Sequence, residues 1–277
     1  MEITVKDEFN NKTIREYLSF YHVAKPMIYK ISINHSTLVN GIEKGFDEKL
    51  NTGDTIFFDL ESIEENNTKP YKDKINIIYE DEDIIILYKP ANMLVHEDGN
   101  TFDTLANRLS FYYQINNLPN AVRPVHRLDF ETTGMILFAK HFLSHSYLNY
   151  LFEQRQVLKK YRCLCEGVFT NISGEINTKI GRHRHENKQI ISKTGKDAQT
   201  KYRVISHQNN MSKVEVIISG GRRHQIRVHM ASIGHPIVGD SLYGNSKMQT
   251  LMLHFYEIAF VHPRTLKKIA IKCDEAF

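Results

Sequence analysis

The pattern of hydrophobic and polar positions predicts many short strands and a few helices. The apolar run at 135–139 is short enough for a strand that is buried on both faces. Leu143, Tyr147 and Leu151 recur at helical spacing and predict an amphipathic helix over 141–156. A second helix is expected over 224–233, because Gly234 is a typical residue just past a helix end. Further strands are expected at 75–79, 84–88, 161–169, 201–206 and 213–219.

The order of these elements indicates the fold class. Strands outnumber helices, and the two do not alternate regularly along the chain. Parallel sheets are built from regular strand-helix-strand units, so this order favours another arrangement. We therefore expect an α+β protein with a mixed, largely antiparallel sheet.

The first part of the chain has the pattern of a small separate domain. A short helical stretch at 13–21 and the segment 25–33 precede extended pieces, which are bracketed by the turn signals Asn40-Gly41 and Gly53-Asp54. A polar stretch that contains Pro70 follows and has the composition of a linker. We predict a small α/β domain at 1–62, a linker at 63–74 that few contacts cross, and a larger domain at 75–277.

Composition excludes several classes of protein without selecting one. The 277 residues are 41% hydrophobic and 25% charged, as in an ordinary globular protein. No apolar run is long enough to cross a membrane and no apolar signal segment follows Met1, so we expect a cytoplasmic protein without a membrane partner. A net charge of +4 permits binding to nucleic acid but does not require it.

Cysteines and histidines do not indicate a metal site. Cys163 and Cys165 lie two positions apart, so on a strand they share one face, and we expect two buried thiols. A zinc site would need two more ligands at suitable spacing, and none follows nearby. The 14 histidines include no His-Glu-x-x-His pair. No metal ligand is predicted.

Two polar clusters have the residue types of a reactive site. In the first, at 123–134, Asp129 precedes the buried strand, Arg127 stands two positions earlier, and Gly134 allows close approach of another backbone. On spacing alone, a turn or capping aspartate is the commoner explanation. In the second, at 220–229, a glycine pair and three arginines lead into a helix. That pattern suits phosphate or carboxylate binding as well as it suits a solvated helix start.

A third cluster, the basic segment 179–196, is rich in cations and contains Gly181 and Gly195. Such a segment can follow a phosphate backbone, although a charge run is more often a solvated loop. It points to nucleic acid only in combination with the other two clusters. Its basic residues are Lys179, Arg182, His183, Arg184, His185, Lys188, Lys193 and Lys196.

Together the clusters resemble the RluA-type RNA pseudouridine synthases. The resemblance covers 75–272 and includes three departures: Thr133 stands where serine is usual, Asn92 where glycine is usual and Gly220 where threonine is usual. None of these removes an ionisable group. The matching motifs are His-Arg-Leu-Asp-x-x-Thr-Thr-Gly at 126–134, Gly-Arg-x-His-Gln-Ile-Arg-Val-His at 221–229 and Gly-His-Pro-Ile-Val-Gly-Asp-x-Leu-Tyr-Gly at 234–244. Shorter pieces agree in the same order, namely Tyr79-Glu-Asp-Glu-Asp, Lys89-Pro-Ala, Lys160-Tyr161 and Gly195-Lys-Asp-Ala-Gln-Thr200.

The resemblance assigns roles to individual residues. It implies that Asp129 is the catalytic carboxylate, that Tyr161 packs against a flipped uracil, and that Arg222 pairs with Asp129 to keep it ionised. Arg227 is a second candidate for that cation. Arg127 would fill the gap that the flipped base leaves in the RNA. The expected substrate contacts are Arg127, His126, Ile226, Arg227, Arg182, Arg184 and Lys196.

The implied reaction moves uracil from a nitrogen link to a carbon link on the same sugar, without redox change or a group donor. No cofactor is therefore expected. The expected partner is ribosomal or transfer RNA, bound by a monomer. The first 62 residues are similar to the small S-four-type RNA-binding domain, on the basis of Val39-Asn40-Gly41 and Gly53-Asp54, but they carry few of its basic residues.

Two alternatives stay open. One is the RsuA-type branch of the same superfamily, against which the histidine at 126 and the full motif at 221–229 argue. The other is a noncatalytic RNA-binding or ribosome-assembly factor. Binding alone does not need Asp129, Tyr161 and Arg222 together at these places, so we favour an enzyme. A metal-dependent nuclease is excluded because the sequence lacks a cluster of carboxylates.

Overall fold

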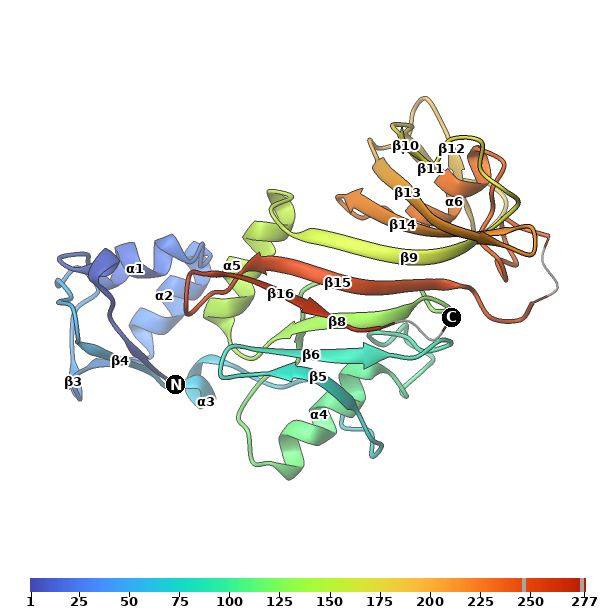
Figure 1. Ribbon diagram of the computed structural model, residues 1–277. Helices are drawn as coiled ribbons and strands as arrows, with labels where there is room; N and C mark the ends of the chain where they lie inside the picture. Colours follow the sequence, from blue (N-terminus) through green and yellow to red (C-terminus); the bar gives the residue numbers. More distant parts are fainter. Residues whose placement is uncertain (246–247, 275–276) are drawn as a thin grey trace.

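A ten-stranded sheet forms the body of the molecule in the computed structural model, which describes residues 1–245, 248–274 and 277 (Figure 1). Its main path is β10 (Ser173–Ile176), β13 (Gln199–Gln208), β14 (Met211–Ser219), β9 (Leu158–Glu166), β15 (Leu253–Val261), β8 (Thr133–Ala139), β6 (Ile84–Lys89) and β5 (Asn76–Glu80). In addition, β16 (Lys268–Lys272) pairs with β15, and β7 (Arg123–Pro124) pairs with β8. Among the strand pairs of the described residues, β8 with β15 is the only parallel one, so the predicted mixed, largely antiparallel sheet is confirmed.

Burial along the strands follows their place in the sheet. β9 and β14 alternate between buried and half-buried residues, as strands with one covered face do. Cys163 and Cys165 occupy buried positions of β9 and are free thiols, which confirms the expectation. β15 is buried along almost its whole length and lies in the middle of the sheet. It was not among the predicted strands, because His254 and Glu257 interrupt its apolar pattern.

Helices cover parts of the sheet. The predicted helices at 141–156 and 224–233 are confirmed as α5 (Phe142–Glu153) and α6 (Gln225–Ser232). His141 begins α5, since its Nδ1 accepts the Ser144 N–H at 3.3 Å. A third helix, α4 (Leu105–Ile115), was not predicted. A hairpin of β11 (Ile180–Arg182) and β12 (Gln189–Ile191) packs beside α6 at the far end of the sheet (Figure 1).

The N-terminal module has a sheet of its own. Its strand order is β1 (Glu2–Thr4), β4 (Thr55–Phe58), β2 (Thr37–Val39) and β3 (Ile42–Glu43). The expected helical stretch at 13–21 is α1 (Ile14–Phe20), where Thr13 and Glu16 form a reciprocal capping box. The other helical pieces are η1 (Asp7–Phe9), α2 (Lys25–Ile33) and α3 (Leu60–Ile63).

Contacts between the N-terminal module and the rest of the chain are more extensive than expected. Tyr21 packs against Tyr147 of α5 with ring centroids 5.6 Å apart, and its hydroxyl donates to the Pro263 carbonyl at 3.2 Å. The ring of His22 stacks on that of Tyr150, with the ring centroids 3.4 Å apart. The expectation of few contacts was wrong, because aromatic side chains of the module complete the cover of α5.

The polar segment 63–74 also packs against the larger domain. The carboxylate of Glu64 is buried, accepts the Phe142 N–H at 2.6 Å and pairs with Arg123 at 3.0 Å. Further along, Asn107 of α4 donates to the Lys69 carbonyl at 2.7 Å. The polar segment is therefore held against the larger domain by hydrogen bonds and an ion pair.

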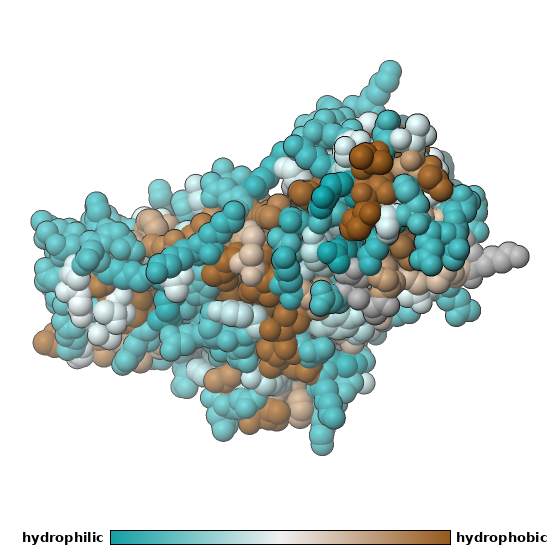
Figure 2. All heavy atoms as spheres, in the orientation of Figure 1, coloured by the Kyte–Doolittle hydropathy of each residue, from teal (hydrophilic) through white to brown (hydrophobic). Residues whose placement is uncertain are grey.

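The surface is mainly hydrophilic on the face that Figure 2 shows, with hydrophobic side chains gathered over the middle of the molecule and in a patch over its upper right. Among the described residues, no helix combines the length and apolar character that crossing a membrane requires.

Candidate active site

Asp129 lies in the short loop between β7 and β8, at the entrance of a buried strand. The Thr132 N–H donates to the Asp129 carbonyl at 3.1 Å and closes a turn. Lys89, at the end of β6, fixes the neighbouring residue, because its Nζ donates to the carbonyls of Phe130 and Met93 at 2.9 Å each. Burial lowers the pKa of Lys89 to about 8, and the charge of Asp129 opposes that shift. A buried lysine thus holds the loop in place.

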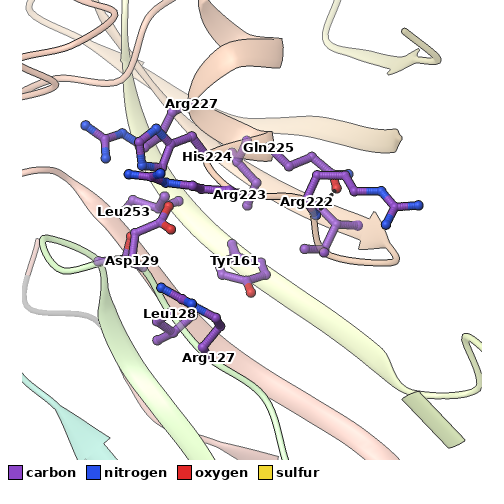
Figure 3. Close-up of a pocket in the computed structure, with 14 residues that line it drawn as sticks. Arg127, Leu128, Asp129, Tyr161, Arg222, Arg223, His224, Gln225, Arg227 and Leu253 are labelled. Atoms are coloured by element: carbon purple, nitrogen blue, oxygen red, sulfur yellow. Dashed lines mark hydrogen bonds between the residues drawn. The ribbon is translucent and has the colours of Figure 1, made fainter. Parts of the chain in front are cut away.

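The half-buried carboxylate of Asp129 lies on the wall of a cavity of about 170 Å³ (Figure 3). Within residues 1–245, 248–274 and 277, no hydrogen bond or ion pair reaches this carboxylate. A carboxylate that is held at a cavity wall without a protein partner is available to a ligand. The cavity is lined by Arg127, Leu128, Asp129, Thr132, Tyr161, Ile218, Gly221, Arg222, Arg223, His224, Gln225, Ile226, Arg227 and Leu253.

Tyr161 of β9 lines the same cavity. Its buried ring stacks on Phe255 of β15, with centroids 4.7 Å apart and 21° between the planes. Phe255 lies against Gly134, where φ is +123° and an added Cβ would come within 2.4 Å of the Phe255 carbonyl oxygen. The close approach predicted for Gly134 is confirmed. Burial, with a smaller effect from Asp129, raises the pKa of the Tyr161 hydroxyl, so the phenol is neutral at pH 7.

His126 lies behind the Asp129 cavity, in the lining of a second cavity that it shares with Arg127. The Leu137 N–H donates to His126 Nε2 at 3.1 Å, and the ring stacks on Phe152 and meets the edge of Phe255. Burial lowers the pKa of His126 to about 3, so the ring is a neutral acceptor at pH 7. Arg127 is exposed and lines both the Asp129 cavity and a second cavity beside it.

Arg222 does not contact Asp129 in this structure. Its Nε donates to the Asp197 carbonyl at 3.1 Å, and its backbone N–H donates to Gln225 Oε1 at 3.0 Å. Gln225 in turn donates to the Gln199 carbonyl at 2.8 Å, which ties the glycine loop to β13. Figure 3 shows Asp129 and Arg222 on opposite sides of Tyr161. The predicted ion pair is therefore absent here, because the guanidinium is turned to a backbone carbonyl.

Arg227 forms an ion pair with Asp240 rather than with Asp129. Its Nε and one Nη donate to the two oxygens of Asp240, each at 2.8 Å, and both side chains are buried. Its other Nη donates to Glu131 at 3.2 Å. Burial alone would lower the pKa of Arg227, but the hydrogen bonds to Asp240 outweigh it and the pKa is raised. Arg227 thus anchors the Asp129 loop through Glu131, while Ile226 beside it contributes an apolar part of the cavity wall.

His224 was not predicted as a site residue. It precedes α6 in a left-handed conformation with φ of +54°, which places its ring in the cavity lining. Tyr243 Oη accepts the Gln189 N–H at 2.7 Å and lies 2.9 Å from His224 Nδ1. The hydroxyl therefore has its own hydrogen to donate to His224 Nδ1. Burial lowers the pKa of His224, with an opposing effect of Asp129, so a neutral ring is expected at pH 7.

The predicted site residues separate into two groups. Asp129, Tyr161, Arg127, Arg222, Ile226 and Arg227 meet at one cavity, with His126 behind it. Arg182, Arg184 and Lys196 are exposed, lie on and beside the β11–β12 hairpin, and are outside the cavity lining. Their RNA contacts stay a prediction. The sequence reasoning missed Phe255, Gln225 and His224, and only the last two lie within a quoted motif.

Comparisons with known proteins agree with this geometry. Residues 83–232 match the family described as RNA pseudouridylate synthase, and residues 1–56 match the family described as the RluD ribosomal pseudouridine synthase N-terminal domain. The chain is 38% identical over 243 residues to the uncharacterized RNA pseudouridine synthase YhcT of Bacillus subtilis, with 85% of this chain and 78% of that protein covered.

Two further similarities have named functions. The chain is 37% identical over 200 residues to ribosomal large subunit pseudouridine synthase D of Escherichia coli, with 71% of this chain and 61% of that protein covered. The solved structure of human RNA Pseudouridylate Synthase Domain Containing 1 superposes with a TM-score of 0.63 at 25% identity, over 74% of this chain and 84% of that chain. This chain therefore belongs to the RluA-type RNA pseudouridine synthase family and has an N-terminal domain of the RluD type.

Proposed function

We propose that this chain converts uridine to pseudouridine in RNA of the large ribosomal subunit, with Asp129 as the group that acts on the sugar. The observation that carries the proposal is the Asp129 carboxylate, which lies beside Tyr161 at a cavity and has no partner among the described residues. Support for the choice of RNA comes from the similarity to a ribosomal large subunit synthase and from the RluD-type N-terminal domain.

The reaction fits a site that offers one carboxylate. The bond between the ring nitrogen of uracil and the sugar breaks, and a bond from a ring carbon to the same sugar carbon forms. That ring carbon loses its hydrogen as a proton, and the ring nitrogen gains a proton, so the product is an isomer. An ionised carboxylate beside the sugar carbon can add to it or stabilise its positive charge, as carboxylates do in glycoside hydrolysis.

The cavity has features that suit a flipped base. A base must leave the RNA stack to bring its sugar to Asp129, which costs a few kcal/mol. Tyr161, supported by Phe255, offers a rigid aromatic surface, and Ile226 and Leu253 add apolar surface. In our proposal the exposed Arg127 takes the place that the base leaves in the RNA.

Asp129→Asn is the test of this function. The substitution keeps the shape of the side chain and removes its charge. We expect it to abolish turnover, while RNA binding and the folded spectrum remain. Asp7→Asn, at an exposed aspartate of the N-terminal module, is the matched control and should react normally. A near wild-type rate for Asp129→Asn would show that the carboxylate is not the reactive group.

The RNA is tested in cells. Pseudouridines should be mapped in total RNA from cells with and without the gene. Loss of a modification in large-subunit ribosomal RNA is expected, and a loss confined to transfer RNA would overturn this choice of substrate.

We further propose that the protein acts as a monomer in the cytoplasm. It needs no metal or cofactor, because the reaction consumes no group or electron. Purified protein with a chelator present should therefore convert uridine in RNA. Light scattering of the active sample tests the monomer, and fractionation of cells tests the location.

A further inference from the structure

A groove extends from the Asp129 cavity on the side away from Asp129. The second cavity shares Arg127, Tyr161 and Arg222 with the first and continues to the end of α5. A third recess begins at Arg155 and follows β13 and β14 to Lys201. Neighbouring hollows share lining residues, so they lie next to one another. We call the second and third together the α5 groove.

Positive charge dominates the α5 groove. Its cations are Arg127, Arg155, Lys159, Arg222 and Lys201, and Glu153 is the acidic residue in its lining. Lys201 lies 3.6 Å from Glu175 in an exposed pair, which is weak in water. A surface of this kind attracts an anion, and a strand of RNA supplies one at every nucleotide.

Lys159 is the most informative of these cations. The residue is only 8% exposed, and its Nζ donates to the Gly220 carbonyl. Among the described residues, no carboxylate lies within ion-pair distance of it. Burial lowers the pKa of Lys159 to about 8, and Arg155 adds to the lowering. An ammonium group that is desolvated without a counter-charge is stabilised when an anion binds.

Arg155 points to the same use. It follows the end of α5 in a left-handed conformation with φ of +57°, a position where glycine would be unstrained. The chain nevertheless has an arginine there, and its exposed side chain lines both parts of the groove. No hydrogen bond or ion pair of this guanidinium occurs within the described residues. The phenyl ring of Phe152 already stacks on His126, so the groove offers cations rather than an open aromatic face.

We propose that the α5 groove binds a backbone phosphate of the RNA strand next to the target nucleotide, with Lys159 and Arg155 as its ligands. The proposal rests on the proposed function, because it assumes that RNA occupies the Asp129 cavity. This site is distinct from the basic segment 179–196, whose side chains do not line the α5 groove. The strand flanking the target then leaves the cavity past Tyr161 toward the end of α5.

Binding of RNA at varied salt tests the ligands. The Asp129→Asn background prevents turnover, and the probe is an oligouridylate of ~12 nucleotides, within the usual range of site sizes. Each lost phosphate contact lowers the magnitude of the slope of log affinity against log salt by about 0.7 on single strands. Because both cations act on one phosphate, we expect a loss of about 0.7 for the double variant and no more than that for Arg155→Gln or Lys159→Gln alone. Lys159→Arg, which keeps the charge, and Lys72→Gln, at an exposed lysine outside the groove, should retain the full slope.

A neutral linkage in the RNA locates the phosphate. One RNA carries a single methylphosphonate, which is neutral, in place of the contacted phosphate beside the target uridine. This RNA should bind the parent protein as weakly as ordinary RNA binds the double variant of Arg155→Gln with Lys159→Gln. Arg155→Gln should bind this RNA no more weakly than the parent protein does. With the methylphosphonate on the other side of the target uridine, Arg155→Gln should still lower the affinity.

The proposal is overturned by an unchanged salt slope in Arg155→Gln. It is also overturned if the loss of affinity from a neutral linkage adds to the loss from Arg155→Gln on both sides of the target uridine. The proposal is also overturned if inorganic phosphate at matched ionic strength abolishes the difference in RNA affinity between Arg155→Gln and the parent protein while neutral linkages do not change that affinity. Free phosphate would then be the ligand. These outcomes do not depend on turnover. Activity of Asp129→Asn would refute the proposed function and leave the binding results standing.

Discussion

His126 shows how burial fixes the protonation state of a single residue. Its Nε2 accepts the Leu137 N–H, a contact that only an unprotonated nitrogen can make. The pKa of His126 is lowered to about 3 in the folded chain, against about 6.5 for an unfolded one. The stability that this contact provides is complete above pH 6.5 and is lost as the pH falls from 6.5 toward 3.

His126→Gln tests this pH dependence. Glutamine still offers an acceptor to Leu137 but does not titrate. Between pH 6.5 and 4.5, the free energy of unfolding should fall by roughly 1–2 kcal/mol less in the variant than in the wild type. His185→Gln, at an exposed histidine, should parallel the wild type. Urea unfolding at each pH measures the effect, and equal acid slopes for all three proteins would contradict it.

Gly134 shows how a missing side chain supports the site. An alanine Cβ there would lie 2.4 Å from the carbonyl oxygen and 2.6 Å from the nitrogen of Phe255, and neither backbone atom can move freely inside the sheet. We expect Gly134→Ala to lower the free energy of unfolding by at least about 2 kcal/mol. Gly99→Ala is the matched control, because φ is +93° but nothing lies within 4 Å. It should cost only the backbone strain, about 1 kcal/mol. Equal losses would show that the contact with β15 is not tight.

Single residues were predictable to the extent that their role is local. Asp129 and Gly134 stand in a motif whose spacing fixes a turn and a strand, so their places followed from the sequence. The direction of Arg222 did not, because the Asp197 carbonyl that takes its Nε is 25 residues away in the chain. Which acceptor an arginine chooses depends on packing across the sheet.

At the scale of elements, α6 is fixed to the Asp129 loop by a buried ion pair. Arg227 of α6 pairs with Asp240 and reaches Glu131 in that loop. Arg227→Met would leave Asp240 buried without its cation. Removing one partner of a buried pair costs about 3–5 kcal/mol, so we expect a large fall in the free energy of unfolding.

Arg222→Met is the comparison. Arg222 is half-buried and donates only to a carbonyl, so its loss should change the free energy of unfolding by less than about 1 kcal/mol. The double variant Arg227→Met with Asp240→Leu should recover part of the stability, because no unpaired charge remains at that position. A stable Arg227→Met with no gain in the double variant would show that the pair is not structural.

Elements were predictable where their pattern is regular. α5 and β14 have clear helical and alternating patterns, and both were found close to their bounds. β15 was missed although it is the central strand, because a strand buried on both faces has no alternation and polar residues such as His254 are satisfied by tertiary contacts. α4 was missed although Thr104 caps it, since its buried face includes Asn107 and Ser110.

At the scale of the molecule, the N-terminal module is docked as well as tethered. Tyr21 and His22 cover Tyr147 and Tyr150 of α5, and Arg264 in the turn after β15 donates to the Glu2 carbonyl at 3.3 Å. The polar segment 63–74 lies between two sheets, but its composition gives no measure of the contacts between them. Those contacts come from aromatic residues at the end of α1, which are distant in sequence from α5.

Removal of residues 1–59 tests the docking. The deletion exposes Phe142, Tyr147 and Tyr150, so we expect a lower melting temperature and binding of an apolar dye. The residues that line the Asp129 cavity all lie between 127 and 253. Well below the melting temperature, the rate at saturating RNA should therefore stay within about twofold of the wild type. An unchanged melting temperature would mean that the aromatic contacts add nothing to stability. A collapsed rate in a folded truncation would instead show that the module holds α5, and through Phe152 the His126 ring, in the position that the cavity requires.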